Sequence, residues 1–246
     1  MQESIDPTRL GPNQTGMLTH PKQSKELEQI IDTLPINDQD AAAIAETRMS
    51  YIEEAEPLGS VPPPATMKGK AKSGKQMLSG NRPQAFVDKL AERLAFERGG
   101  TRLYDALLAK FNVFGDELKG VSEGELLEIR NEEAAHALLI KECIEQLGAD
   151  PTAQTPCADL VGVESAGLLQ AVTDPRTTLA QSLHAALAAE LIDNAGWETL
   201  IAMAEEMGQK KMAERFREAL REEGEHLDNV RRWYHALTLE SANLVS

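Results

Sequence analysis

Apolar residues recur at mixed three- and four-residue spacing along the C-terminal two thirds of the chain, as they do on one face of an α-helix. Almost no alternating strand pattern interrupts them. Ser122, with Glu125 three residues later, has the form of a capping box, and Gly148 and Pro151 follow where that pattern ends. The pattern predicts an all-α body, a four-helix bundle with helices over residues 83–111, 122–148, 176–207 and 209–237.

The connection between the second and third predicted helices is long for antiparallel neighbours. It runs from Gly148 to Pro175 and contains one short apolar piece, Ala166 to Val172, which predicts one or two helical turns. A connection of this length allows the chain to cross from one end of the bundle to the other.

The first part of the chain has a weaker pattern. Ser24 to Leu34 and Asp38 to Glu56 are expected to form short, weakly amphipathic helices. Prolines and glycines then interrupt helical structure, and a basic stretch without acids follows: Lys68, Lys70, Lys72, Lys75 and Arg82. We expect an N-terminal extension with a linker over residues 1–82 and the bundle over residues 83–246. The favoured interpretation of the basic stretch is a solvated segment docked on the chain's own acidic body; the alternative is contact with a partner or an anionic ligand.

Composition narrows the class of protein. The chain has 246 residues, of which 41% are hydrophobic, and a formal charge of −15, with 11 acidic and 9 basic residues in 1–82 and 29 and 16 in 83–246. This sign disfavours binding to nucleic acid or to an anionic membrane surface. Cys143 and Cys157 form neither a disulfide framework nor a thiolate zinc motif. Because no run approaches eighteen apolar residues and no signal-peptide pattern is present, we expect a soluble, cytoplasmic protein.

Two helices carry the same chemical motif. Glu133-Ala-Ala-His136 and Glu223-Gly-Glu-His226 each place a carboxylate and an imidazole three residues apart, on one helix face. The other two long helices contribute single acids, Glu97 and Glu190, at positions where the apolar stripe would run. Helical spacing therefore directs all six side chains to one core.

Four buried carboxylates would cost several kcal/mol apiece without compensation. The four carboxylates carry −4, which two divalent ions would neutralise, and each histidine can supply one neutral nitrogen. A ligand set rich in oxygen and free of sulfur suits iron or manganese. We therefore expect a dinuclear centre with two Fe ions, with Mn as the alternative.

This order of motifs resembles the ferritin-like di-iron carboxylate superfamily, of which bacterioferritin and rubrerythrin are the nearest familiar members. The resemblance covers residues 83–237. Successive glutamates are 36, 57 and 33 residues apart. The first and third spacings are similar to those in bacterioferritin and rubrerythrin, and the second is longer. The resemblance implies metal ligation by Glu97, Glu133, His136, Glu190, Glu223 and His226.

The resemblance also implies roles around these ligands. Tyr104, a catalytic candidate, lies where relatives carry a tyrosine whose hydroxyl reaches a ligand carboxylate across the bundle. Glu132 and Glu222 lie where the family usually has an aspartate behind the histidine of the opposite motif, so Glu132 is expected behind His226 and Glu222 behind His136. Asp193 resembles the extra carboxylate of rubrerythrin and is expected to be an additional ligand or a hydrogen-bonding group.

The resemblance implies oxidation of Fe(II) with reduction of O2 or H2O2, as in a ferroxidase or a rubrerythrin-like peroxidase active against oxidative stress. Because the cysteines of a rubredoxin centre are missing, an external electron donor would be needed, and we expect a homodimer or higher homo-oligomer. Two alternatives stay open. One is a di-iron oxygenase or manganese catalase on the same site. The other is a stress-associated interaction or scaffold protein without catalysis.

Overall fold

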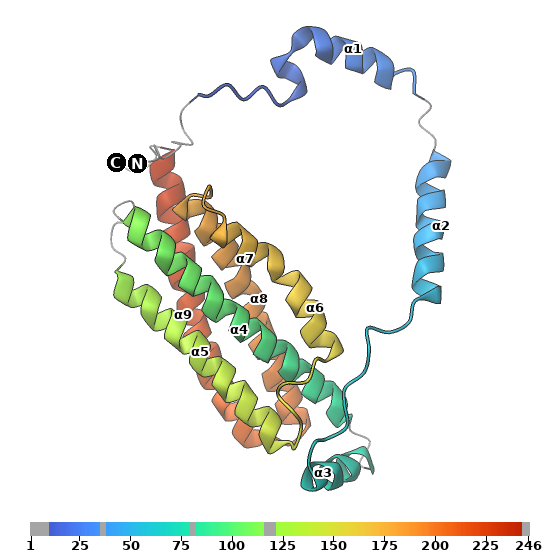
Figure 1. Cartoon of the computed structure of the whole chain (residues 1–246), viewed down its shortest axis with the longest axis vertical. Coiled ribbons are helices and arrows are strands. Elements are labelled where there is room, and N and C mark those ends of the chain that lie inside the picture. Colours follow the sequence, from blue (N-terminus) through green and yellow to red (C-terminus); the bar gives the residue numbers. More distant parts are fainter. Residues whose placement is uncertain (1–9, 35–37, 79–81, 116–121, 243–246) are drawn as a thin grey trace. The chain divides into compact units, whose positions relative to one another are not determined.

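The structure, a computed structural model, describes residues 10–34, 38–78, 82–115 and 122–242. The chain divides into two compact units, Met1–Pro57 and Leu58–Ser246. The described residues form helices and no β-strand (Figure 1). None of the described helices is both long enough and apolar enough to cross a membrane.

The N-terminal unit contains the 3-10 turn η1 (Met17–Thr19) and the helices α1 (Pro21–Ile31) and α2 (Asp38–Glu54). Both expected helices are therefore present. Helix α1 begins earlier than the apolar pattern predicts because Pro21 occupies its first turn, where a missing N–H costs no hydrogen bond. Its apolar side chains are exposed, among them Leu27, Ile30 and Ile31.

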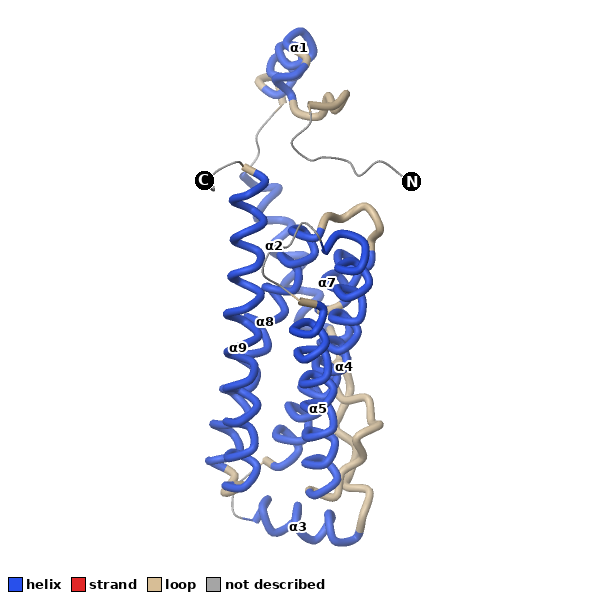
Figure 2. Tube along the Cα trace, turned by 90° about the vertical axis from the view of Figure 1, so that its left-hand side faces the viewer, coloured by secondary structure: helices blue, strands red, loops and turns tan. Residues whose placement is uncertain are grey.

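The second unit is built on four long helices: α4 (Pro83–Phe114), α5 (Glu123–Gln146), α8 (Leu179–Glu206) and α9 (Lys210–Ser241). Helix α4 packs against α5 and α8, and α8 packs against α9. Figures 1 and 2 show the four lying side by side. The predicted all-α, ferritin-like four-helix bundle is confirmed.

Helix ends follow their local chemistry. Ser122 and Glu125 form the predicted capping box at the start of α5. The helix ends before Gly148, whose φ of +80° is a conformation that glycine adopts without strain. Helix α8 begins at Leu179 rather than at the predicted 176, because Thr178 and Gln181 form a second capping box.

Two helices occupy the long connection between α5 and α8. Helix α7 (Ala166–Thr173) coincides with the predicted apolar piece, whereas α6 (Pro156–Glu164) was not predicted. Both lie against α4, and α7 also contacts α8, as Figure 1 shows. The connection therefore covers the α4–α8 side of the bundle.

Within the segment predicted as a linker, the four lysines of the basic stretch lie on a helix, α3 (Met67–Leu78). The Ala65 N–H donates to the Gly148 carbonyl at 2.8 Å. A Cβ on Gly148 would lie 2.5 Å from the Gly69 Cα, so glycine at position 148 permits this close approach. These long-range contacts join the segment to the bundle, and the compact unit accordingly begins at Leu58 rather than at 83. The side chains of Lys68 and Lys70 are exposed.

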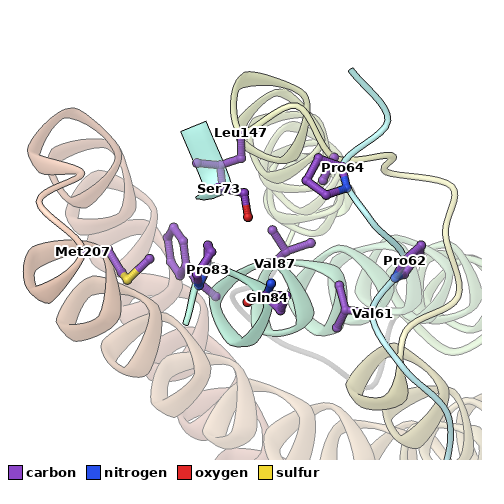
Figure 3. Close-up of a pocket in the computed structure, with 11 residues that line it drawn as sticks. Val61, Pro62, Pro64, Ser73, Pro83, Gln84, Val87, Leu147 and Met207 are labelled. Atoms are coloured by element: carbon purple, nitrogen blue, oxygen red, sulfur yellow. The ribbon is translucent and has the colours of Figure 1, made fainter. Parts of the chain in front are cut away.

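A mainly apolar pocket lies where this segment meets the bundle (Figure 3). Its lining comes from the segment before α3, from α3 itself, from the first turns of α4, and from the ends of α5 and α8. The lining residues are Val61, Pro62, Pro64, Ser73, Pro83, Gln84, Phe86, Val87, Leu147, Ala149 and Met207. None of the predicted ligands lines it.

Candidate metal centre

A buried polar cluster lies midway along the four long helices, between two hydrophobic clusters. On α4, Phe86, Leu90 and Leu94 of one hydrophobic cluster precede Glu97, and Leu103, Tyr104 and Leu107 of the other follow it. The same change of cluster occurs at the Glu-x-x-His motifs of α5 and α9 and at Glu190 on α8. All six predicted ligands and Asp193 are buried. The structure therefore brings together every residue that helical spacing directed inward.

The cluster contains overlapping groups of candidate ligands. Glu97, His136 and Glu223 form one group, and Glu133, Glu190, Glu223 and His226 form another. A third group combines Glu97, Glu133, Asp193 and Glu223. Within each group one candidate ligand atom from every member lies within 4.8 Å of the others. Glu223 belongs to all three groups, and Glu97 and Glu133 belong to two each. Glu223 is therefore shared by the group that contains His136 and the group that contains His226.

Many oxygen and nitrogen atoms of the cluster that could bind a metal lack a hydrogen-bond partner. Among the described residues these include both carboxylate oxygens of Glu97, one oxygen each of Glu133, Glu190 and Glu223, and Nδ1 of His136. Nδ1 of His136 and Oε1 of Glu223 lie only 2.6 Å apart, yet neither has a partner with hydrogen-bond geometry. Because unpartnered buried polar atoms are costly, their convergence is what a site built for cations would show.

The outer nitrogens of both imidazoles are held from the opposite helix, as predicted. His136 Nε2 lies 2.8 Å from Glu222 Oε2, and His226 Nε2 lies 2.7 Å from Glu132 Oε2. These contacts leave each Nδ1 directed to the cluster. The side chains of Glu132 and Glu222 are 35% and 39% exposed, so they lie between the imidazoles and solvent. The length of the two glutamate side chains therefore does not prevent contact with the imidazoles.

Tyr104 also occupies its predicted place. Its hydroxyl donates a short hydrogen bond to Oε1 of Glu190 across the bundle. The other oxygen of Glu190 has no hydrogen-bond partner. The contact therefore fixes one oxygen of this carboxylate and leaves the second directed into the cluster.

A buried arginine that the sequence pattern did not predict, Arg93, lies beside the cluster. Its Nη1 makes a short ion pair with Oδ1 of Asp193 and donates to the Asp193 carbonyl at 2.9 Å. Its Nε lies 3.5 Å from Oε1 of Glu97. The available signal was position: Arg93 is one helical turn before Glu97 and so shares its inward face.

Two small features also position the candidate ligands. A Cβ on Gly100 would lie 2.0 Å from Oε2 of Glu133, so the absence of a side chain at residue 100 makes room for that carboxylate. The Asn194 side chain donates to the backbone carbonyls of Glu190 at 3.0 Å and Glu223 at 3.1 Å, which ties α8 to α9 beside the cluster.

Burial and mutual contacts shift the pKa values of the acids and histidines in the cluster. Burial raises the pKa values of Glu97 and Glu190, and neighbouring acids raise them further. Burial opposes protonation of His136, but contacts with Glu223 and Glu222 raise its pKa to about 9. Burial likewise opposes protonation of His226, yet Glu133 and Glu223 raise its pKa to about 12. Positive charge is thus favoured at this position.

The donor set fits divalent metal ions. The buried acids of the cluster, Asp193 included, carry −5 when ionised, and Arg93 brings the total to −4. Two divalent ions would neutralise this charge while both histidines bind as neutral nitrogens. Carboxylate oxygens with few nitrogens and no sulfur suit iron or manganese. The cluster can therefore hold metal, and His184 and His235, which are exposed, lie outside it.

No curated protein and no solved structure matches the chain. A family model described as "Domain of unknown function (DUF892)" matches residues 81–243. The matched segment contains all four long helices and the whole buried cluster. The chain belongs to the DUF892 family.

Proposed function

We propose that the bundle binds two iron ions and oxidises Fe(II) while reducing O2 or H2O2. The observation that supports this most strongly is that the ligand group of Glu97 and His136 and the ligand group of Glu190 and His226 share Glu223 and contain unpartnered buried oxygens. Glu133 belongs to the second of these groups and also lies within ligand distance of Glu97. In this proposal Glu97 and His136 would hold one ion, and Glu190 and His226 would hold the other. Glu223 and Glu133 would contribute ligands between the two.

A bound pair of ferrous ions supplies two electrons, enough to reduce O2 to H2O2 or H2O2 to two water molecules with uptake of two protons. The side chains of this protein orient the centre. Glu132 and Glu222 fix the tautomer of the histidines by accepting from Nε2–H, which leaves Nδ1 as the metal-binding nitrogen. Tyr104 orients Glu190 in the same way.

Access and shielding differ between the sides of the bundle. Helices α6 and α7 cover the α4–α8 side, whereas the partly exposed Glu132 and Glu222 extend from α5 and α9. Protons can therefore reach solvent through these carboxylates. The buried apolar residues above and below the cluster leave little polar lining for a specific organic substrate, among them Leu90, Leu126, Ile129, Leu183 and Phe216. This supports a small oxidant and disfavours hydroxylation.

The proposal extends to the surroundings of the centre. A peroxidase cycle needs an electron source, and with Cys143 and Cys157 as its only cysteines the chain has no thiolate set for a second iron centre. An external electron donor is thus part of the proposal. We also propose a cytoplasmic homo-oligomer as the working form.

Stopped-flow oxidation tests this function. The metal-free protein is loaded anaerobically with two equivalents of Fe(II) and mixed separately with O2 and H2O2. Optical detection of the oxidised pair gives the preferred oxidant. Oxidation no faster than that of Fe(II) in buffer, or loss of H2O2 with release of O2 by a manganese-loaded sample alone, would contradict the proposal; the second result would indicate a catalase.

A matched variant links the reaction to the cluster. Glu223→Gln removes the charge of the acid common to all three ligand groups, and Glu225→Gln makes the same change on an exposed position of α9. We expect Glu223→Gln to abolish fast oxidation and Glu225→Gln to retain it. Equal rates in the two variants would place the reaction elsewhere.

A further inference from the structure

Arg93 is a fully buried cation beside the candidate metal centre. Its side chain is 4% exposed, and its two carboxylate neighbours, Asp193 and Glu97, are at least as buried. Asp193 receives both a short ion pair from Nη1 and, at its own carbonyl, a second contact from the same nitrogen. Glu97 lies farther from the guanidinium, 3.5 Å from Nε, and its oxygens have no hydrogen-bond partner.

The surrounding residues hold the guanidinium in one position. Its central carbon lies 4.4 Å from the centre of the Phe96 ring and 6.0 Å from that of Trp197, an arrangement that is favourable for a cation over an aromatic face. A Cβ on Gly196 would lie 2.6 Å from Nη1 and 2.9 Å from Cζ of Arg93. The helix α8 therefore has room for this side chain only because residue 196 is glycine.

Asp193 belongs to one of the ligand groups by distance, but the charge of the site depends on how it is used. As a free acid it would bring the buried carboxylates to −5, one more negative charge than two divalent ions neutralise. Paired with the permanently charged arginine, Asp193 contributes nothing to the net charge. One of its oxygens is then engaged by Nη1, which competes with coordination to a metal.

We propose that Arg93 is a positioning residue that keeps Asp193 out of the ligand set and sets the charge of the site to match two divalent ions. This rests on the proposed function, since it concerns the same dinuclear centre. The pair leaves four glutamates and two histidines as ligands. With the charges of Arg93 and Asp193 cancelling, the four glutamates carry −4, which two divalent ions would neutralise.

Co2+ binding tests this without any turnover. Four variants form a charge series: Arg93→Gln, Asp193→Asn, the double variant, and Arg93→Lys, which keeps the charge. Each metal-free protein is titrated with Co2+ while heat and visible absorption are recorded. The absorption reports coordination number, and the heat reports stoichiometry and affinity for each ion.

If net charge controls metal binding, Asp193→Asn and Arg93→Gln should change the affinity for Co2+ in opposite directions. Asp193→Asn leaves Arg93 unbalanced and should weaken binding of the second Co2+ on the order of tenfold or more, because a like charge stays nearby in a medium of low dielectric constant. Its absorption spectrum should match that of the unaltered protein, since Asp193 is not a ligand. Arg93→Gln should tighten binding and alter the spectrum as Asp193 enters the coordination shell. The double variant should resemble the unaltered protein, as should Arg93→Lys in affinity.

If Arg93 and Asp193 only stabilise the fold, the variants should show a different pattern of Co2+ affinities. In that case Arg93→Gln and Asp193→Asn would both weaken binding, and that result overturns the proposal. A changed spectrum in Asp193→Asn alone would show that Asp193 is a ligand and would also overturn it. If Arg93→Gln does not fold, Asp193→Asn and Arg93→Lys still decide by affinity and spectrum. Failure of the unaltered protein to bind two Co2+ would instead contradict the proposed function.

Discussion

Gly100→Ala removes the space that Glu133 occupies, and it has a matched control in the same helix. A Cβ at residue 100 would lie 2.0 Å from Oε2 of Glu133, whereas ordinary contact begins at 3.4 Å. The carboxylate must therefore shift by more than about 1 Å, which exceeds the tolerance of about 0.2 Å that metal–ligand distances allow. At the neighbouring Gly99 the nearest atom is Oγ of Ser165, at 4.0 Å, so alanine fits there.

The two substitutions should separate stability from metal binding. Alanine is favoured over glycine inside a helix by about 1 kcal/mol, and Gly99→Ala should show up to this gain with unchanged metal binding. In Gly100→Ala the atom that must move is the end of a flexible side chain, so the metal-free protein should stay within about 1–2 kcal/mol of the unaltered one. The effect of Gly100→Ala should appear when metal is added, as a smaller gain in stability than the unaltered protein shows.

Thermal and urea unfolding with and without anaerobic Fe(II) provide the assay. A ligand present at 100 times its Kd stabilises the folded state by about 2.7 kcal/mol. The unaltered protein and Gly99→Ala should gain about this amount under such conditions, and Gly100→Ala should lose most of it. An equal gain in both variants, with two equivalents bound, would refute the placement of Glu133 as a shared ligand.

Three further outcomes follow from the cluster. His226→Ala should lower the binding stoichiometry from two ions to one, whereas His184→Ala, on an exposed position, should leave it at two by calorimetry. Glu222→Gln should weaken metal binding by about 10–100-fold through the imidazole it orients, and equal affinity in Glu225→Gln and Glu222→Gln would contradict that role. The pKa of His136 is raised from 6.5 to about 9 in the metal-free protein, so its stabilising contribution is complete below pH 6.5 and is lost as pH rises through 9. Metal-free protein should therefore unfold more easily at pH 9 than at pH 6.5, while metal affinity, which requires deprotonation, should rise over the same range; a parallel rise of both would contradict this reasoning.

The long helices and their inward-facing acids could be predicted from sequence because both depend on local periodicity. An amphipathic repeat fixes which residues share a face, and Glu133 and His136 had to lie together once α5 formed. The cap at Ser122 is equally local. The opposed pairing of Glu132 with His226 followed from the resemblance to relatives and is found in the structure.

What could not be predicted depends on contacts between distant segments. Helix α3 has a glycine-rich, lysine-rich sequence with little intrinsic signal, and it packs at Gly148, far along the chain. From the sequence alone, Arg93 would be expected on the surface. It is buried because Asp193, 100 positions later, pairs with its charge. Gly196 could not be predicted for the same reason. A side chain at residue 196 would collide with Arg93, and this contact exists only in the folded protein.

The most direct test of the dinuclear centre is anomalous diffraction at the iron absorption edge from crystals loaded anaerobically with Fe(II). The proposed function predicts two peaks midway along the bundle, both in contact with Glu133 and Glu223 and each beside one of the two histidines. Peaks confined to the surface, or no ordered iron between α4, α5, α8 and α9, would contradict it.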